Sequence, residues 1–326
     1  MSGLSDSFNR PINYLRISVT DRCNLRCVYC MPAEGVCLMP HSDILTYEEI
    51  YKVAQAAAEL GISKVRLTGG EPLVRLGLTE LVRMLASIKE IDDLSLTTNG
   101  IFLAKYAAEL KAAGLHRVNI SLDTLVPEQF RQISRGGNIE DVLRGMAAAK
   151  SAGLTPIKIN MVVMAGTNDN EIIDFGRKTI TDGWHVRFIE CMPFGKTENE
   201  SVFVPVTKMK RQLQALGKLE PCSVHKGNGP AQYFRFPGAS GTVGFITPVS
   251  EHFCFGCNRL RLTADGKLRL CLLNEEEIDL RERLRNGMTA EELKNLIKEA
   301  VASKPLRHRL ADGKVPRGRP FSQVGG

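Results

Sequence analysis

A repeated alternation of short β-rich runs and longer helical stretches constrains this chain more than any other feature of its sequence. It extends over residues 14–216, and turns rich in glycine or polar residues separate the runs. Strands are predicted at 14–19, 64–68, 94–98, 117–121, 157–163 and 184–189. Helices are predicted at 47–60, 79–90, 103–113, 139–151, 170–181 and 207–216. Six such units in series imply a parallel sheet with helices outside it, either open and doubly wound or curled into a barrel.

Polar residues at every second strand position decide between these two forms. A strand buried on both faces usually forms a continuous apolar run. Four strands here carry polar pairs instead, each pointing to one face: Arg16 and Ser18, Arg66 and Thr68, Asn119 and Ser121, Lys158 and Asn160. Helices cover the apolar face, so the polar face lines a wet or ligand-filled interior, for which a complete eight-stranded barrel has no room. The sequence therefore predicts an α/β fold, an incomplete (β/α)6 TIM-type barrel; an exposed edge strand is the alternative for one or two pairs.

The alternation ends near residue 220, where we place the end of the barrel. Residues 229–247 are predicted as short strands, and 259–270 as a hairpin that turns at Asp265 and Gly266. Two helices are predicted near 275–285 and 289–303, and the cationic tail over 304–319 is expected to be irregular. We therefore divide the chain into a barrel, residues 1–220, and a C-terminal region, residues 221–326.

Charge and targeting signals limit the class of protein. The formal net charge of +7 favours an anionic ligand without requiring nucleic acid. No apolar run approaches the roughly 20 residues of a membrane helix, and the N-terminus has no signal-peptide core. We therefore expect a cytoplasmic protein with no nucleic-acid or membrane partner. In that compartment the nine cysteines are better candidates for metal binding or redox chemistry than for disulfides.

Six of these cysteines form two groups with the spacing of metal ligands. The N-terminal triad follows the first strand directly, where barrel enzymes place their chemistry: Cys23, Cys27 and Cys30. The C-terminal triad has the spacing C-x2-C-x13-C: Cys254, Cys257 and Cys271. Three thiolates can hold three irons of a four-iron cluster and leave the fourth iron open. A zinc site is the alternative, with His41 as the only local histidine near the N-terminal triad. His252 is a possible fourth ligand beside the C-terminal triad.

The residues around the N-terminal triad resemble the radical S-adenosylmethionine (radical SAM) superfamily. The resemblance lies in SVTDRCNLRCVYCMP at 18–32 and TGGEP at 68–72. In that superfamily the open iron is chelated by SAM, whose reductive cleavage yields a 5′-deoxyadenosyl radical. Glycines just after a strand also let backbone carbonyls approach a ligand closely.

The C-terminal triad resembles that of one family within this superfamily, the GTP 3′,8-cyclases of molybdenum cofactor biosynthesis. The similar segments are CFGCNRLRLT at 254–263 and the terminal pair Gly325 and Gly326. The resemblance implies a lyase that converts GTP to (8S)-3′,8-cyclo-7,8-dihydroguanosine 5′-triphosphate. It also implies two 4Fe-4S clusters, with SAM as a further cofactor, and guanine bound at the open iron of the second cluster. The C-terminal region would carry that cluster, the GTP-binding arginines and the double-glycine tail.

Matching the family motif position by position gives the expected contacts. Those to SAM fall on Tyr29, Gly70, Ser121 and Met192. Those to GTP fall on Arg16, Arg66, Thr97, Lys158, Arg259, Leu260 and Arg261. No side chain is nominated as a general base. Expected partners are an electron donor of unknown identity and a downstream pterin-forming enzyme, and the protein is expected to be a monomer or homodimer.

Two of these assignments have a physical basis of their own. Arg259 and Arg261 share one face of a predicted strand, and their guanidinium groups suit phosphate oxygens, although a surface salt bridge is the alternative.

Two other functions stay open at this point. One is a radical SAM enzyme with an auxiliary cluster that oxidises a peptide, and the other is a non-enzymatic protein with two zinc sites.

Overall fold

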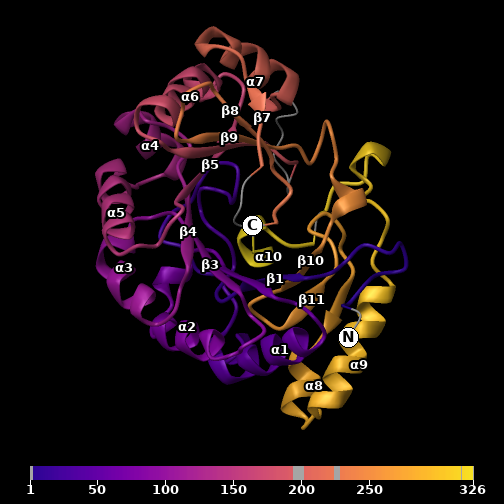
Figure 1. The fold of residues 1–326 in the computed structure, drawn as a ribbon. Helices are drawn as coiled ribbons and strands as arrows, with labels where there is room; N and C mark the ends of the chain where they lie inside the picture. The colour runs from indigo at the N-terminus through magenta and orange to yellow at the C-terminus, as the bar shows by residue number, and fades with distance from the viewer. Residues whose placement is uncertain (1–2, 194–201, 224–227, 317, 326) are drawn as a thin grey trace.

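One continuous sheet organises the molecule. The computed structural model describes residues 3–193, 202–223, 228–316 and 318–325. In these residues twelve strands follow the order β12-β11-β10-β1-β2-β3-β4-β5-β6-β9-β8-β7. The sheet curves around a central space and the helices α1 to α6 lie on its outer side (Figure 1).

The six predicted barrel strands are confirmed to within one residue at each end. They are parallel, and each pairs with the next along the chain. Their bounds are β1 Tyr14–Ser18, β2 Lys64–Thr68, β3 Asp93–Thr98, β4 Arg117–Ser121, β5 Lys158–Val163 and β6 His185–Glu190. Consecutive order and parallel pairing are the pattern of a barrel of βα units, so the incomplete TIM-type barrel is confirmed.

The six predicted helices are all present, but not every predicted boundary is correct. They are α1 Tyr47–Glu59, α2 Leu78–Ala86, α3 Leu103–Ala112, α5 Ile139–Ser151, α6 Ile172–Thr181 and α7 Val206–Leu213. The sequence analysis missed α4, Pro127–Ser134, which begins with a proline at its first turn. It also extended α2 too far, because Ser87 already ends that helix.

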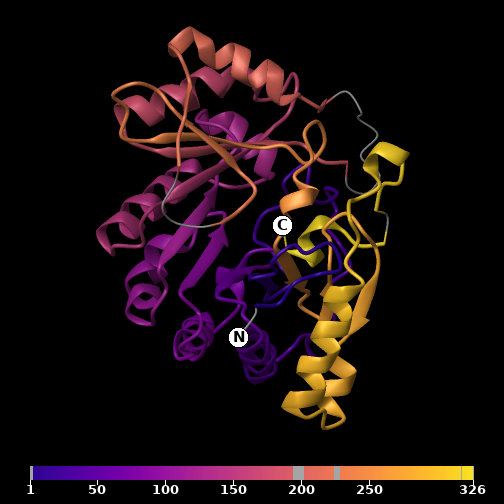
Figure 2. The same cartoon turned by 45° about the vertical axis from the view of Figure 1, so that its right-hand side comes forward.

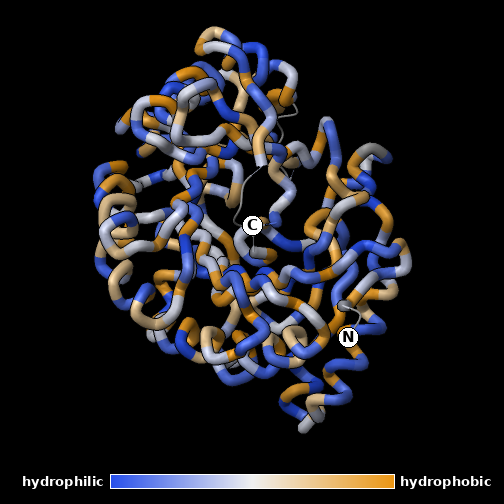
Figure 3. The backbone as a smooth tube through the Cα atoms, viewed as in Figure 1, coloured by the Kyte–Doolittle hydropathy of each residue, from blue (hydrophilic) through white to orange (hydrophobic). Residues whose placement is uncertain are grey.

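Local sequence explains where several helices begin and which face they bury. In α1 the side chain of Thr46 accepts from the Glu49 backbone amide, and Glu49 reaches back to Thr46. This capping box satisfies amide groups that a helix start leaves without partners. The buried face of α1 consists of small and branched residues, including Val53 and Ala57. Hydrophobic and hydrophilic segments alternate along the outer helices (Figure 3), as expected for helices that cover one face of a sheet.

Two strands of the C-terminal region continue the barrel at its two edges. Strand β9 (Thr242–Ile246) is parallel to β6, and β10 (Arg259–Leu262) is parallel to β1. The prediction of a hairpin at 259–270 is confirmed, because β10 pairs antiparallel with β11 (Lys267–Arg269). The outermost strands are β8 (Gln232–Arg235) with β7 (Glu220–Pro221), and β12 (Glu277–Asp279). The division at residue 220 stays a prediction, and strands from both sides of it share one sheet.

The helix predicted over 275–285 is wrong in its first half. Glu277–Asp279 pairs with β11 as β12, and α8 spans only Arg281–Arg285. Cross-strand ion pairs favour the strand, because Glu277 faces Arg269 and Asp279 faces Lys267. The next helix, α9 (Ala290–Ala302), agrees with the prediction and starts with a second capping box.

The C-terminal tail turns back into the molecule and ends inside the curve of the sheet (Figure 2). A short 3-10 turn at Leu310–Asp312 precedes it, and its last element is α10, Phe321–Val324. Ser322 and Val324 are buried. No helix of the described residues has the length and apolar character to cross a membrane.

Candidate functional site

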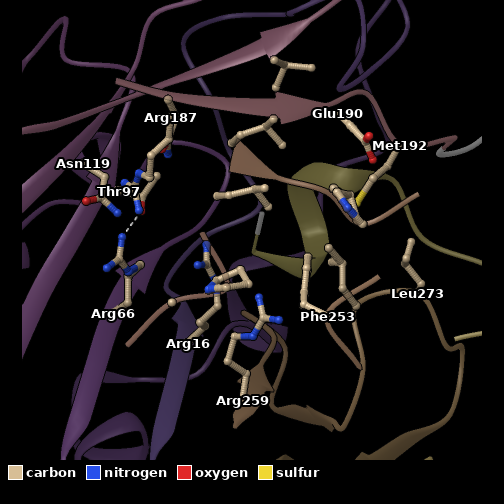
Figure 4. A pocket seen from close by; sticks show the side chains of 18 of the residues that line it. Arg16, Arg66, Thr97, Asn119, Arg187, Glu190, Met192, Phe253, Arg259 and Leu273 are labelled. Carbon is tan, nitrogen blue, oxygen red and sulfur yellow. Dashed lines mark hydrogen bonds between the residues drawn. The ribbon is translucent and has the colours of Figure 1, made fainter. Parts of the chain in front are cut away.

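A cavity inside the curve of the sheet brings together most of the residues predicted to bind SAM and GTP. It is lined by Tyr29, Ser121, Met192, Arg16, Arg66, Thr97, Lys158, Arg259 and Arg261. All three cysteines of the C-terminal triad line it as well. Figure 4 shows Arg16, Arg66 and Arg259 pointing into this space from below and Arg187 from above. The cavity lining does not include Gly70, Leu260 or the N-terminal triad.

Strand register explains why the cations gather. Arg16 on β1 stands opposite Arg66 on β2 and opposite Arg261 on β10. Residues in register on parallel strands point to the same face of the sheet. Three guanidinium groups therefore lie on one rung of the barrel, and all three are directed inward, as the sequence alternation predicts.

Burial lowers the pKa of these cations. The pKa of Arg16 is lowered to about 10, first by burial and then by neighbouring arginines. The pKa of Lys158 is lowered to about 6 by burial, with Arg187, Arg117 and Arg66 adding repulsion. Arg187 has two buried nitrogens, Nε and Nη2, that find no hydrogen-bond partner among the described residues. Unsatisfied buried donors and mutual repulsion are both relieved by an anionic ligand.

The lining residues that the sequence analysis missed include Arg187, Tyr14 and Tyr233. Arg187 lies on β6 between the buried Val186 and Phe188, so period-two alternation on that strand is the signal that would have found it. Tyr14 accepts a hydrogen bond from Nε of Arg66, whose Nη1 donates to Thr97 over 3.4 Å. Tyr233 packs its ring centroid 5.2 Å from Nζ of Lys158. Tyr14 lies two residues before Arg16 on the same strand, so period-two alternation would also have placed it on the inward face. Nothing in the local sequence of Tyr233 marks it, because its role depends on a contact with a distant strand.

The N-terminal triad lies in the loop that leaves β1. The Arg26 and Val28 amides donate to Ser134 and Ile133 at the end of α4, which holds the loop against the barrel. A side chain at Gly70 is excluded, because its Cβ would lie 2.3 Å from the carbonyl oxygen of Arg22. The segment 68–72 therefore packs directly on the cysteine loop.

The surroundings of the N-terminal triad are apolar and acidic. Burial raises the pKa of Cys23 to about 11, and Glu71 adds to the shift. The pKa of Cys30 is raised to about 12 by burial, by Cys23 and by Asp123. Tyr29 donates a hydrogen bond of 2.8 Å to Asp123, which lines the cavity. Once ionised, these neighbouring thiolates repel one another, and a bound cationic group would neutralise them.

The hairpin of β10 and β11 builds the C-terminal triad. Cys254 and Cys257 flank a 3-10 turn just before β10, and Cys271 follows β11, so the hairpin returns it to the other two. Burial opposes ionisation of Cys257, but Arg259 and Lys304 outweigh it and lower its pKa to about 6. Nη2 of Arg259 lies 3.6 Å from the Cys257 sulfur. Thiolates are the form that binds metal.

Each triad offers three free cysteine thiols, the donor type of iron–sulfur clusters. In the described residues, no three His, Cys, Asp or Glu side chains are placed to bind one metal ion together. In a four-iron cluster each thiolate binds a different iron, so its ligands stand apart. His252 packs its ring against Phe255 and His308. If each triad binds a four-iron cluster through its three thiolates, one iron would be left for a ligand from outside the chain.

The tail reaches the same region. Nη1 of Arg261 donates to the carbonyl oxygen of Gly325. Gly325 has φ +70°, and a Cβ there would lie 2.9 Å from Thr68, so glycine suits this close approach. Gly326 lies outside the described residues.

Comparison with known proteins agrees with this geometry. Residues 17–178 match the Radical SAM superfamily, and residues 184–310 match the family described as Molybdenum Cofactor Synthesis C. The crystal structure of Streptococcus suis SuiB bound to S-adenosylmethionine has a TM-score of 0.63 over 90% of this chain and 68% of its own, at 14% identity. That likeness concerns the fold alone. With its open barrel and its cysteine loop after the first strand, this chain is a radical SAM protein.

Curated relatives define the family more narrowly. A GTP 3',8-cyclase of Moorella thermoacetica is 53% identical, covering 99% of this chain and 100% of the relative. One from Pelotomaculum thermopropionicum is 52% identical with the same coverage of both chains, 99% and 100%. This chain belongs to the GTP 3',8-cyclase family. The resemblance found in the sequence is thus confirmed, and the peptide-oxidising and zinc-scaffold alternatives are not supported.

Proposed function

We propose that this protein converts GTP to (8S)-3′,8-cyclo-7,8-dihydroguanosine 5′-triphosphate, the first step of molybdenum cofactor biosynthesis. The observation that carries the proposal is the row of buried, inward-facing cations that shares one cavity with the C-terminal triad. A triphosphate carries about three to four negative charges, and burying it requires several fixed cations of this kind. The names of the relatives, at 50–53% identity over nearly the whole chain, support the same substrate.

The N-terminal triad would hold the 4Fe-4S cluster to which SAM binds. When bound, this pair of cofactors supplies the 5′-deoxyadenosyl radical that removes a hydrogen atom from C3′ of the ribose. We assign the SAM contacts to Tyr29, Gly70, Ser121 and Met192. Their support is that Tyr29, Ser121 and Met192 line the cavity, and that Gly70 packs on the cysteine loop.

The C-terminal triad would hold the second 4Fe-4S cluster, facing the guanine base. We assign GTP contacts to Arg16, Arg66, Thr97, Lys158, Arg259, Leu260 and Arg261, and add Arg187. These groups would bind the triphosphate and hold GTP in a conformation in which C3′ of its ribose lies near C8 of its guanine. The two reacting atoms are then oriented before the bond forms. The curved sheet and the tail shield the reacting atoms from water. Ring closure needs no general base from the protein.

Reductive cleavage of SAM would consume one external electron and leave methionine, and the hydrogen atom removed from C3′ would end up in 5′-deoxyadenosine. The C3′–C8 bond then forms, and a second external electron and one proton complete the product, which therefore has the mass of GTP. A ring is formed without hydrolysis or group transfer, so we assign the protein to the lyases. A cytoplasmic location, an external electron donor, a downstream pterin-forming enzyme, and a monomeric or homodimeric state stay parts of the proposal.

The test uses protein purified without oxygen and supplied with a reductant, SAM and GTP. We expect 5′-deoxyadenosine, methionine and a nucleotide isomer of GTP in equal amounts, identified by mass and NMR. The Cys27→Ser variant should form none of the three. Protein that carries about eight irons per chain and forms 5′-deoxyadenosine, but leaves GTP unchanged, would contradict the proposal.

A further inference from the structure

A buried lysine holds the two strands that carry the C-terminal triad. Lys304 follows α9 and is 2% exposed. Its Nζ donates to the carbonyl oxygen of Arg259 over 2.9 Å and to that of Leu270. Arg259 lies two residues after Cys257, and Leu270 directly precedes Cys271. One ammonium group therefore joins β10 to the end of β11 at the positions that set the separation of these two cysteines.

A second buried cation secures the segment of Lys304 to the remaining cysteine. Nη1 of Arg10 donates to the carbonyl oxygens of Cys254 (2.7 Å) and Leu306 (2.8 Å), and Nη2 to that of Pro305 (2.7 Å). Its Nε pairs with Asp6 at 2.6 Å. The backbone of all three triad segments is thus tied to residues 304–306.

The two cations differ in charge balance. Arg10 is neutralised by Asp6. Lys304 forms no ion pair with a carboxylate in the described parts of the chain, and the anions that act on its ammonium group are the thiolates of Cys257 and Cys271. Arg259 and Arg10 act on it with the same sign of charge. The positive charge of Lys304 is therefore directed at the thiolates.

We propose that Lys304 is a positioning residue for the second cluster, and that its charge raises the reduction potential of that cluster. Reduction adds one negative charge to the cluster, and a fixed cation nearby stabilises the reduced form more than the oxidised form. Burial of Lys304 keeps solvent from screening this effect. The inference rests on the proposed assignment of the second cluster to the C-terminal triad.

The experiment compares three full-length variants loaded with both clusters. Lys304→Met removes the charge at similar length, and Lys304→Arg keeps it. Lys298→Met changes an exposed lysine of α9, the helix that precedes Lys304. Each is titrated with reductant and followed by electron paramagnetic resonance. The Cys257→Ser variant assigns the signals to the two clusters.

For Lys304→Met we expect at least a tenfold shift of the second cluster's one-electron equilibrium toward the oxidised form. This shift corresponds to a midpoint potential about 59 mV lower than in the wild type. The N-terminal cluster, Lys304→Arg and Lys298→Met should titrate as in the wild type. An unchanged midpoint in Lys304→Met, or an equal shift in Lys304→Arg, would overturn the role of the charge.

Iron content covers the case in which the second cluster does not assemble. Loss of about four irons in Lys304→Met, with full iron in Lys304→Arg, supports the positioning role through the charged contact. Loss in both variants would overturn it. Wild-type protein with only about four irons would instead contradict the proposed function, so the two failures are distinguishable.

Discussion

At the scale of single residues, the charge state of Lys158 distinguishes it from the arginines of the cavity. Burial and the cations Arg187, Arg117 and Arg66 lower its pKa to about 6, whereas the lowered arginines stay charged at neutral pH. A lowered lysine pKa means that the unfolded chain binds more protons between about pH 6 and pH 10. Across that window the free energy of unfolding therefore rises with pH, because the cost of burying the charged ammonium disappears as Lys158 loses its proton.

Lys158 should take up a proton when GTP binds. A bound triphosphate favours the charged ammonium, so we expect uptake of up to about one proton per GTP near pH 7.5, and weaker GTP binding as pH rises above 7. Calorimetric titrations in buffers of different ionisation enthalpy measure this uptake. Lys158→Arg should retain binding and lose the uptake. Equal uptake in that variant would show that another group takes the proton.

Arg259 connects the nucleotide to the C-terminal triad. Replacing Arg259 by alanine removes a charge-assisted contact worth about 1.5–3 kcal/mol, so GTP should bind roughly 10- to 150-fold more weakly. Uncoupled SAM cleavage should stay near its wild-type rate, because the N-terminal triad is unchanged. Equilibrium binding and 5′-deoxyadenosine formation separate the two effects. Intact GTP binding with lost SAM cleavage would show that Arg259 has been assigned to the wrong ligand.

At the scale of elements, the position of α10 depends on contacts made before it begins. Nη2 of Arg319 donates to Asp265 and to Glu277, each at 2.8 Å, and Nη1 also reaches Asp265. These acceptors lie in the β10–β11 turn and in β12. The helix then places Gly325 against Arg261. Strand β12, which the sequence analysis predicted as part of a helix, therefore helps to anchor the tail.

Arg319→Ala should release α10 from the cavity without unfolding the barrel. We expect faster amide hydrogen exchange over residues 321–324, a lower rate of GTP cyclisation, and little change in the thermal midpoint of the whole chain. Arg309→Ala serves as the control, because the ion pair of Arg309 that the described residues show is with the nearby Asp312, and both side chains are exposed to solvent. Unchanged exchange in Arg319→Ala would mean that the packing of Val324 and Ser322 and the Arg261–Gly325 hydrogen bond hold the helix without Arg319.

At the scale of the whole molecule, the two triads are independent in sequence but share one curved sheet. The N-terminal triad follows β1 and the C-terminal triad flanks β10, which pairs with β1. Each triad is nevertheless closed by its own loop and its own neighbours. The two clusters should therefore assemble separately.

Cys257→Ser tests this independence. Anaerobically reconstituted variant protein should carry about four irons instead of about eight, because one thiolate ligand of the second cluster is lost. SAM binding and slow SAM cleavage should persist. Cys27→Ser should show the reverse, keeping GTP binding while losing SAM cleavage. Loss of both clusters in either variant would show that assembly is coupled.

The sequence by itself determined the barrel, the two triads and the inward cations Arg16, Arg66 and Lys158. These depend on periodicity and spacing, which local residue order carries. Tertiary structure alone decided that β9 and β10 pair with the barrel strands β6 and β1, and that residues 277–279 form a strand. It also decided the cavity contact of Tyr233 and the buried place of Lys304, which the sequence analysis put at the start of an irregular tail. Strand pairing and burial depend on residues far apart in the chain, for example 304 with 259 and 319 with 265. No local pattern records which of those distant groups will meet.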